Sequence, residues 1–207
     1  MVIPTIALEE KLWREGFLHV AGVDEAGKGP LAGPVTAGAV MIHNENQVVE
    51  SVRDSKLMTR LEREKAFEII CKKSTAFGIG IVSQEEIDDI GIEKAVRKAM
   101  LQALISLEEK FKLSISFVLV DGSRTLPLLK YKSQRILKGG LYHYSISAGS
   151  VLAKVTRDRI MKDFAKIYPQ YLFEKHVGYG TKKHFALLKN YGPCPIHRKS
   201  FAPMKYL

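Results

Sequence analysis

Residues 21–35, AGVDEAGKGPLAGPV, place two acids between an apolar run and a set of glycines. Residues 18–23 have the character of a short buried strand, so Asp24 and Glu25 are expected at a strand end. Successive strand side chains point to opposite faces, and both acids can serve one site only if the chain bends there. Neighbouring carboxylates repel each other and tend to bind a proton or a cation such as Mg²⁺. A polar turn with solvated acids is the competing interpretation.

A second apolar strand also ends on an acid. Residues 115–122 read ISFVLVDG and place Asp121 where the apolar run stops. Strand ends gathered along one edge of an α/β sheet are where sites usually form. We therefore expect Asp24, Glu25 and Asp121 to converge, although an Asp-Gly turn after a strand is also common.

The rest of the chain alternates between short apolar runs and amphipathic segments, which predicts an α/β fold. Capping-box patterns, Thr59 with Glu62 and Ser83 with Glu86, mark two helix starts. Further strands are expected over 36–42 and 76–82, and helices over 61–73, 92–110, 145–168 and 181–190. In the helix over 145–168 we expect Ile167 to face inward and Arg157 to be more exposed.

Charge is distributed unevenly along the 207 residues, whose net charge is +10. Residues 1–120 carry 15 bases and 18 acids, whereas residues 121–207 carry 17 bases and 4 acids. Such an uneven charge distribution favours a polyanionic partner, with nucleic acid as the preferred one. The alternative is a basic surface that only keeps the protein soluble. Tyrosines interleaved with these bases could contact sugars or stack on bases: Tyr142, Tyr144, Tyr168, Tyr171, Tyr179 and Tyr191.

Composition excludes several other classes of protein. No apolar run approaches the roughly 20 residues that span a bilayer, and the N-terminus lacks a basic start, so a cytoplasmic protein is expected. Cys71 and Cys194 form no CxxC pair, and Cys194 with His197 supplies only half of a zinc site.

Six motifs follow one another over about 180 residues. They are GVDEAGKGPLAGPV, DSK at 54–56, VLVDG at 118–122, ISAGSVLAKVTRDRIM at 146–161, the YP-Q-Y and GYGT-KKH elements at 168–184, and HRKSF at 197–201. In order and spacing they resemble bacterial ribonuclease HII, the type 2 ribonuclease H.

The resemblance implies a ribonuclease H-like fold, a central mixed β-sheet flanked by helices. Residues 1–167 would form the catalytic domain, and residues 168–207 a small helical C-terminal part that contacts substrate. The implied reaction is metal-dependent hydrolysis of the phosphodiester 5′ to a ribonucleotide, in an RNA–DNA hybrid or embedded in duplex DNA. It leaves a 3′-hydroxyl and a 5′-phosphate, and a monomer without membrane contact is expected to carry it out.

The same resemblance implies roles for individual residues. Asp24, Glu25 and Asp121 match metal-binding acids that hold two Mg²⁺ or Mn²⁺ ions. The loop Gly27-Lys28-Gly29 would approach the ribose 2′-hydroxyl, although the family usually has Arg where Lys28 stands. Tyr179 matches a tyrosine that stacks on the deoxyribose after the ribonucleotide. Four further residues fall in motifs near the nucleic-acid backbone, with packing or capping as the alternative: Lys56, Ser147, Ser150 and Lys154.

One position departs from the family pattern. Family members usually read Lys-Gly-Asp where this chain has Lys138-Gly139-Gly140, and that Asp is the fourth active-site carboxylate. The next acid downstream, Asp158, lies too far along its helix to substitute. An inactivating change, a variant whose gap is filled by water or substrate phosphate, and a sequence error all remain open. A weakened or inactive protein that binds hybrids is therefore the alternative function, and a nuclease or recombinase acting on all-DNA substrates is disfavoured by Gly27-Lys28-Gly29 and Tyr179.

Overall fold

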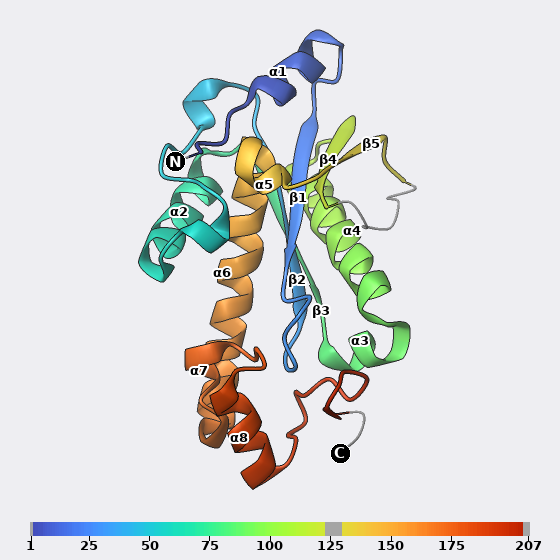
Figure 1. Ribbon diagram of the computed structural model, residues 1–207. Coiled ribbons are helices and arrows are strands. Elements are labelled where there is room, and N and C mark those ends of the chain that lie inside the picture. The colour runs from blue at the N-terminus through green and yellow to red at the C-terminus, as the bar shows by residue number, and fades with distance from the viewer. Residues whose placement is uncertain (1, 123–129, 205–207) are drawn as a thin grey trace.

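A computed structural model describes residues 2–122 and 130–204 (Figure 1). Its centre is a five-stranded sheet in the order β3-β2-β1-β4-β5. The strands are β1 (Val20–Ala26), β2 (Val35–Met41), β3 (Ala76–Val82), β4 (Phe117–Asp121) and β5 (Ser133–Ile136). Strands β1, β2 and β3 pair antiparallel, whereas β4 pairs parallel with both β1 and β5. The expected mixed α/β sheet is confirmed.

Helices surround this sheet. They are α1 (Ala7–Arg14), α2 (Arg60–Lys73), α3 (Gln84–Ile90), α4 (Ile92–Phe111), α5 (Gly139–Tyr142), α6 (Tyr144–Ile167), α7 (Phe173–His176) and α8 (Lys182–Tyr191). Short 3₁₀ helices are η1 (Glu45–Gln47), η2 (Ser55–Leu57) and η3 (Pro169–Tyr171). Within the described ranges, no helix is long and apolar enough to cross a membrane.

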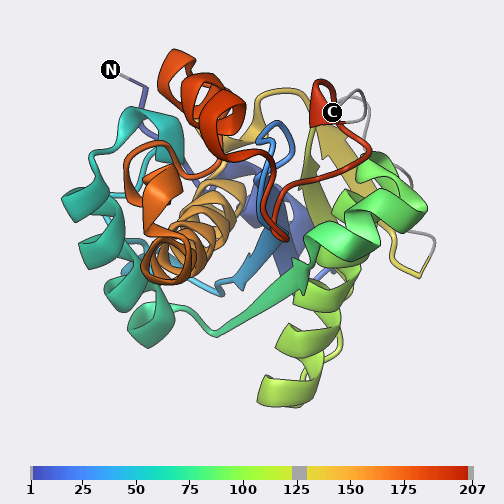
Figure 2. The same cartoon turned by 90° about the horizontal axis from the view of Figure 1, so that it is seen from below.

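Two apolar layers hold the helices on the sheet. Helix α4 covers one face, and α6 with α2 covers the other (Figures 1 and 2). Met100 and Leu104 of α4 are completely buried on the first face, as are Val151 and Leu152 of α6 on the second. Burial of side chains of this size contributes about 1.5–3 kcal/mol each.

Helix α6 approaches the sheet unusually closely because glycine faces glycine at the contact. A Cβ at Gly149 would lie 2.5 Å from the carbonyl oxygen of Gly38, and a Cβ at Gly38 would lie 2.3 Å from that of Gly149. Any side chain at either position would therefore push the helix away. The close contact brings Ser150, the next residue of α6, to the acids of β1.

The C-terminal part packs against the rest of the chain through a further apolar cluster. Tyr171, Phe173 and Leu188 pack there together with Leu31 of the β1–β2 connection and Met161 of α6. Helices α7 and α8 consequently lie at the lower end of α6, beside the Gly-rich loop (Figure 1).

Several expectations from the sequence hold at the level of single residues. Strand β3 spans 76–82 as expected, and Thr59 with Glu62 forms a complete capping box at the start of α2. Ser83 accepts a hydrogen bond from the backbone of Glu86 at the start of α3. The predicted helices 92–110 and 145–168 match α4 and α6 to within one residue.

Three expectations were wrong. Strand β1 does not end before Asp24 but continues to Ala26, and the chain turns only at Gly27, whose φ is +96°. Arg157, expected to be exposed, is 0% exposed, whereas Ile167, expected to face inward, is 64% exposed. Arg157 is buried because backbone carbonyls of the neighbouring loop satisfy its guanidinium.

Candidate active site

Strands β1 and β4 bring two acids to one edge of the sheet. The strands run parallel with Val23 beside Val120, so Asp24 and Asp121 are the next residues on neighbouring strands. Asp24 is only 9% exposed, and Asp121 is half-buried. Parallel pairing thus joins two chain segments that the sequence keeps about a hundred residues apart.

Electrostatics show that the three acids interact. Burial, followed by the charges of Glu25 and Asp121, raises the pKa of Asp24 well above its usual value of 3.8. The pKa of Glu25 is also raised, first by burial, while Lys28 lowers it and Asp121 raises it. These carboxylates are therefore close enough to disfavour one another's ionised form, as the sequence predicted.

The raised pKa of Asp24, caused first by burial and then by the neighbouring acids, predicts a pH dependence of stability. An acid whose pKa is higher in the folded state destabilises the fold as pH rises from its unfolded value, here 3.8 for Asp24, through the raised value. We expect Asp24→Asn to melt at a higher temperature than the wild type in EDTA, with a difference that grows as pH rises above 3.8. Thermal unfolding followed by circular dichroism checks this. A difference that stays constant with pH would contradict the raised pKa.

The glycine pair in α5 lies directly beside these acids. The backbone N–H of Gly139 donates to Oδ1 of Asp121 at 2.8 Å. A Cβ at Gly140 would lie 3.9 Å from Oδ2 of Asp121 and 3.8 Å from Oδ2 of Asp54, both ordinary contact distances. The space above Gly140 can therefore take a side chain, and two carboxylate oxygens border it.

Asp54 is the residue that the sequence analysis missed. It precedes η2, and its Oδ1 accepts a hydrogen bond from the backbone N–H of Lys56 at 2.9 Å, while Oδ2 borders the space at Gly140. The signal was present, since Asp54 opens the DSK motif. It was read as a loop residue because a helix-capping Asp and an active-site Asp look alike in sequence.

Oxygen donors of this kind suit Mg²⁺ or Mn²⁺, because hard cations prefer carboxylates. Within residues 2–122 and 130–204, however, no three His, Cys, Asp or Glu side chains are gathered closely enough to hold a metal ion. The donor set fits a divalent cation in its chemistry, because it consists of carboxylate oxygens.

Two buried arginines fix the Gly-rich loop that follows β1. Arg157 donates to the carbonyls of Ala32, Pro34 and Val177, each at 2.9 Å. Arg198 donates to carbonyls of the same loop, those of Gly27, Lys28, Gly33 and Pro34. Burial lowers the pKa of Arg157 to about 10 and that of Arg198 to about 9, so both stay charged at neutral pH. The loop conformation is thus set by charge-assisted hydrogen bonds.

The two glycines of Gly27-Lys28-Gly29 differ in their surroundings. A Cβ at Gly27 would lie 2.2 Å from Nε of Arg157, so internal packing requires that glycine. A Cβ at Gly29 would meet only the ring of Tyr179, at 4.0 Å. Gly29 and the 44% exposed Tyr179 therefore share one surface, while Lys28 forms a 2.6 Å ion pair with Glu93.

Of the remaining predicted site residues, Ser150 and Lys56 lie beside acids, whereas Ser147 is buried. Ser150 donates to the carboxylate of Asp24, and its Oγ lies 2.8 Å from that of Ser55. Lys56 is exposed beside Asp54. Ser147, by contrast, is completely buried, and its Oγ has no hydrogen-bond partner in the described part of the chain.

Lys154 lies one turn beyond Ser150 on α6. It forms a 2.7 Å ion pair with Asp158 and lies 5.9 Å from the centre of the Tyr179 ring. Of the tyrosines proposed to contact nucleic acid, Tyr144 and Tyr171 are buried in apolar clusters and cannot do so. Tyr142, Tyr179 and Tyr191 are exposed.

Several solved structures of ribonucleases share this architecture. The ribonuclease H2 of Pyrococcus horikoshii OT3 superposes with a TM-score of 0.72 at 27% identity, covering 91% of this chain and 96% of that one. Bst ribonuclease HIII in complex with Mn²⁺ superposes with a TM-score of 0.66, covering 91% and 68%, and at 14% identity it shows the fold alone. The protein therefore has a ribonuclease H-like fold.

Sequence comparison identifies the family within this class of ribonucleases. Residues 21–204 match the ribonuclease HII family. The ribonuclease HII of Caldicellulosiruptor bescii is 48% identical over 194 residues, which cover 94% of this chain and 91% of that protein. The chain belongs to the ribonuclease HII family, whose members are phosphodiester hydrolases that depend on divalent metals.

Proposed function

We propose that this protein is an endoribonuclease that hydrolyses the phosphodiester 5′ to a ribonucleotide in an RNA–DNA hybrid or in duplex DNA. The products are a 3′-hydroxyl and a 5′-phosphate. The meeting of Asp24 and Asp121 at one sheet edge, with Glu25 next to Asp24, carries this proposal, since the raised pKa values of Asp24 and Glu25 mark a site that favours a cation. The protein acts on its substrate as a monomer.

Asp24, Glu25 and Asp121 hold the metal, two Mg²⁺ or Mn²⁺ ions. Bound divalent metal activates a water and stabilises the leaving oxygen in reactions of this type. The hydroxyl of Ser150 and the backbone N–H of Gly139 orient Asp24 and Asp121 by hydrogen bonds. Asp54 borders the space left by Gly140 and is a further carboxylate available to the same metal site.

The ribonucleotide is recognised by the surface that Gly29 and Tyr179 share. Backbone groups of Gly27, Lys28 and Gly29 approach the 2′-hydroxyl, the group that separates RNA from DNA. Gly29 supports this role, because a Cβ there would meet only the ring of Tyr179. Internal packing therefore does not require a glycine at this position. The exposed ring of Tyr179 stacks on the following deoxyribose, and residues 168–207 form the small part that presents it to the substrate.

Three polar residues beside the acids hold the nucleic-acid backbone. Lys56 and Lys154 supply charge, and Ser150 supplies a hydroxyl next to Asp24. Ser147 belongs to the same motif, but its side chain is completely buried and does not reach the substrate. Its role is therefore indirect, through the position of α6.

Incision of a defined substrate tests the proposal. We expect a duplex DNA with one ribonucleotide to be cut once, 5′ to that ribonucleotide, in Mn²⁺ or Mg²⁺ but not in EDTA. An all-DNA duplex of the same sequence is the control and stays intact. Absence of incision with every divalent metal, or equal cutting of the all-DNA duplex, would contradict the proposal.

Gly140 favours a second candidate function. A chain that lacks one hard ligand can bind a hybrid with little cutting, because binding depends on the basic surface and cutting on the metal. Binding without incision by the wild type, together with incision by Gly140→Asp, would identify this second function.

A further inference from the structure

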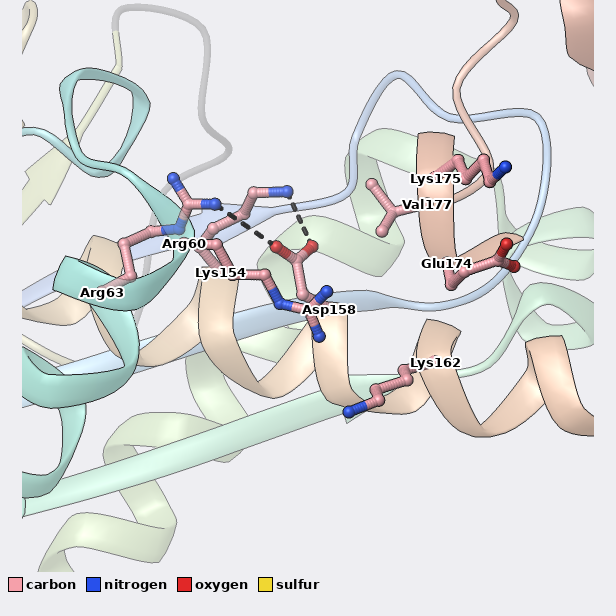
Figure 3. A pocket seen from close by; sticks show the side chains of 8 residues that line it. All are labelled: Arg60, Arg63, Lys154, Asp158, Lys162, Glu174, Lys175 and Val177. Atoms are coloured by element: carbon pink, nitrogen blue, oxygen red, sulfur yellow. Dashed lines mark hydrogen bonds and ion pairs between the residues drawn. The ribbon is translucent and has the colours of Figure 1, made fainter. Parts of the chain in front are cut away.

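A polar cavity of about 190 Å³ lies between α2, α6 and α7 (Figure 3). Its lining residues are Arg60, Arg63, Lys154, Asp158, Lys162, Glu174, Lys175 and Val177. None of Asp24, Glu25 and Asp121 is among them, so the cavity is distinct from the metal site. It begins at Lys154, one helical turn beyond the serine that bonds Asp24.

The cavity contains more positive charge than its own acids can neutralise. Asp158 is fully engaged, at 2.7 Å from Nζ of Lys154 and 3.7 Å from the guanidinium of Arg63 (Figure 3). Of its five basic residues, the remaining three form no ion pair in the described part of the chain. These three are Arg60, Lys162 and Lys175. Glu174 is the other acid among the lining residues, and Asp163, outside the lining, also interacts with Lys162.

Arginine and lysine side chains from three helices line this cavity, although the head of Lys175 points away from Asp158 in Figure 3. Several cations around one opening suit an anion of several oxygens, and phosphate is the common one. The volume corresponds to about six water molecules, which leaves room for a phosphate with part of a sugar. Arg60, Lys162 and Lys175 are all exposed, so a polymer can reach them from solvent.

Position along α6 indicates which phosphate binds. From Lys154 to Lys162 the helix rises about 12 Å, leading away from the acids in a single direction. A row of cations that starts beside a proposed cleavage site suits successive phosphates of one strand better than a free ion. We infer that this cavity binds a backbone phosphate of the hybrid, beyond the phosphate that is cut. The inference rests on the proposed function for the identity of the polymer.

Binding without cleavage tests the inference. The double variant Arg60→Gln/Lys162→Gln removes two unpaired cations of the cavity. Lys72→Gln/Lys73→Gln makes the same charge change at the other end of α2, on exposed residues. The affinity for a labelled RNA–DNA hybrid is measured in EDTA by fluorescence anisotropy at several salt concentrations.

We expect the cavity variant to bind the hybrid about tenfold more weakly, with a salt slope reduced by about 1 because one phosphate contact is lost. The control variant should bind within about twofold of the wild type. At saturating substrate, kcat of the cavity variant stays near the wild-type value, because none of its altered residues touches the acids.

Three results would overturn the inference. The cavity variant could bind as tightly as the wild type, or the control could lose as much affinity, which would indicate a general charge effect. Inorganic phosphate could raise the melting temperature of the wild type but not of the cavity variant while hybrid affinity stays equal, which would indicate a site for small phosphates.

The proposed function can fail separately. If the wild type binds the hybrid through the cavity but cuts nothing in Mn²⁺, the inferred phosphate site is supported and the proposed nuclease activity is contradicted. A wild type that cuts, with a cavity variant that binds equally well, contradicts the cavity alone.

Discussion

Asp24→Asn abolishes incision while leaving hybrid binding intact: this is the largest effect we expect. Asp24 is buried and interacts electrostatically with both other acids, so its carboxylate is central to any shared cation. An amide keeps the shape and the acceptor for the N–H of Glu25, which bonds Oδ1 of Asp24 at 2.7 Å, but carries no charge. We expect kcat to fall about a thousandfold or more, equal to about 4 kcal/mol of transition-state stabilisation.

Two measurements exclude trivial causes of that loss. The melting temperature in EDTA should rise at neutral pH, since the variant removes a buried carboxylate whose pKa is raised by burial and by neighbouring acids. The affinity for hybrid in EDTA should stay within a few-fold of the wild type. Asp163→Asn, at an exposed acid paired with Lys166, is the matched control and should cut normally. Full activity of Asp24→Asn would remove Asp24 from the metal site.

Gly140→Asp is expected to increase the rate. The Cβ fits without a clash, and its carboxylate would enter the space that Asp54 and Asp121 border. Gly140 has no left-handed backbone conformation, so an Asp there is not strained. A further hard ligand strengthens metal binding, and we expect kcat/KM to rise about 10- to 1000-fold, or about 1.4–4 kcal/mol.

Gly140→Ala is the matched control, because it adds the Cβ without the carboxylate and should leave the rate unchanged. Mn²⁺ affinity, measured by calorimetry, should tighten for Gly140→Asp alone. No gain in either rate or Mn²⁺ affinity would show that a missing ligand does not limit this protein.

A double-mutant cycle assigns the role of Asp54. If its carboxylate compensates for Gly140, Asp54→Asn should lower Mn²⁺ affinity more in the wild type than in the Gly140→Asp background. Equal losses in both backgrounds would leave Asp54 as a helix cap only.

Sequence patterns were sufficient where the cause is local. Capping boxes and helical periodicity predicted the starts of α2 and α3 and the extent of α4, because those signals lie within a few residues of one another. Two apolar strands ending on acids predicted that Asp24 and Asp121 would meet, since parallel strands align their ends. The short strand β5, Ser133–Ile136, has no apolar pattern and was missed, because its pairing with β4 defines it.

The tertiary structure alone decided what depends on contacts between distant segments. Arg157 reads as an exposed helix residue, yet carbonyls of a loop more than a hundred positions earlier make its burial favourable. Asp54 reads as a loop residue, and only the fold places its Oδ2 beside Gly140. The sequence by itself determined the family and four of the five strands, and it predicted that Asp24 and Asp121 lie at neighbouring strand ends. The residues around Gly140 and the charge balance of the α2–α6–α7 cavity were decided by packing, because burial and Coulomb interactions depend on distances in space and not on separation along the chain.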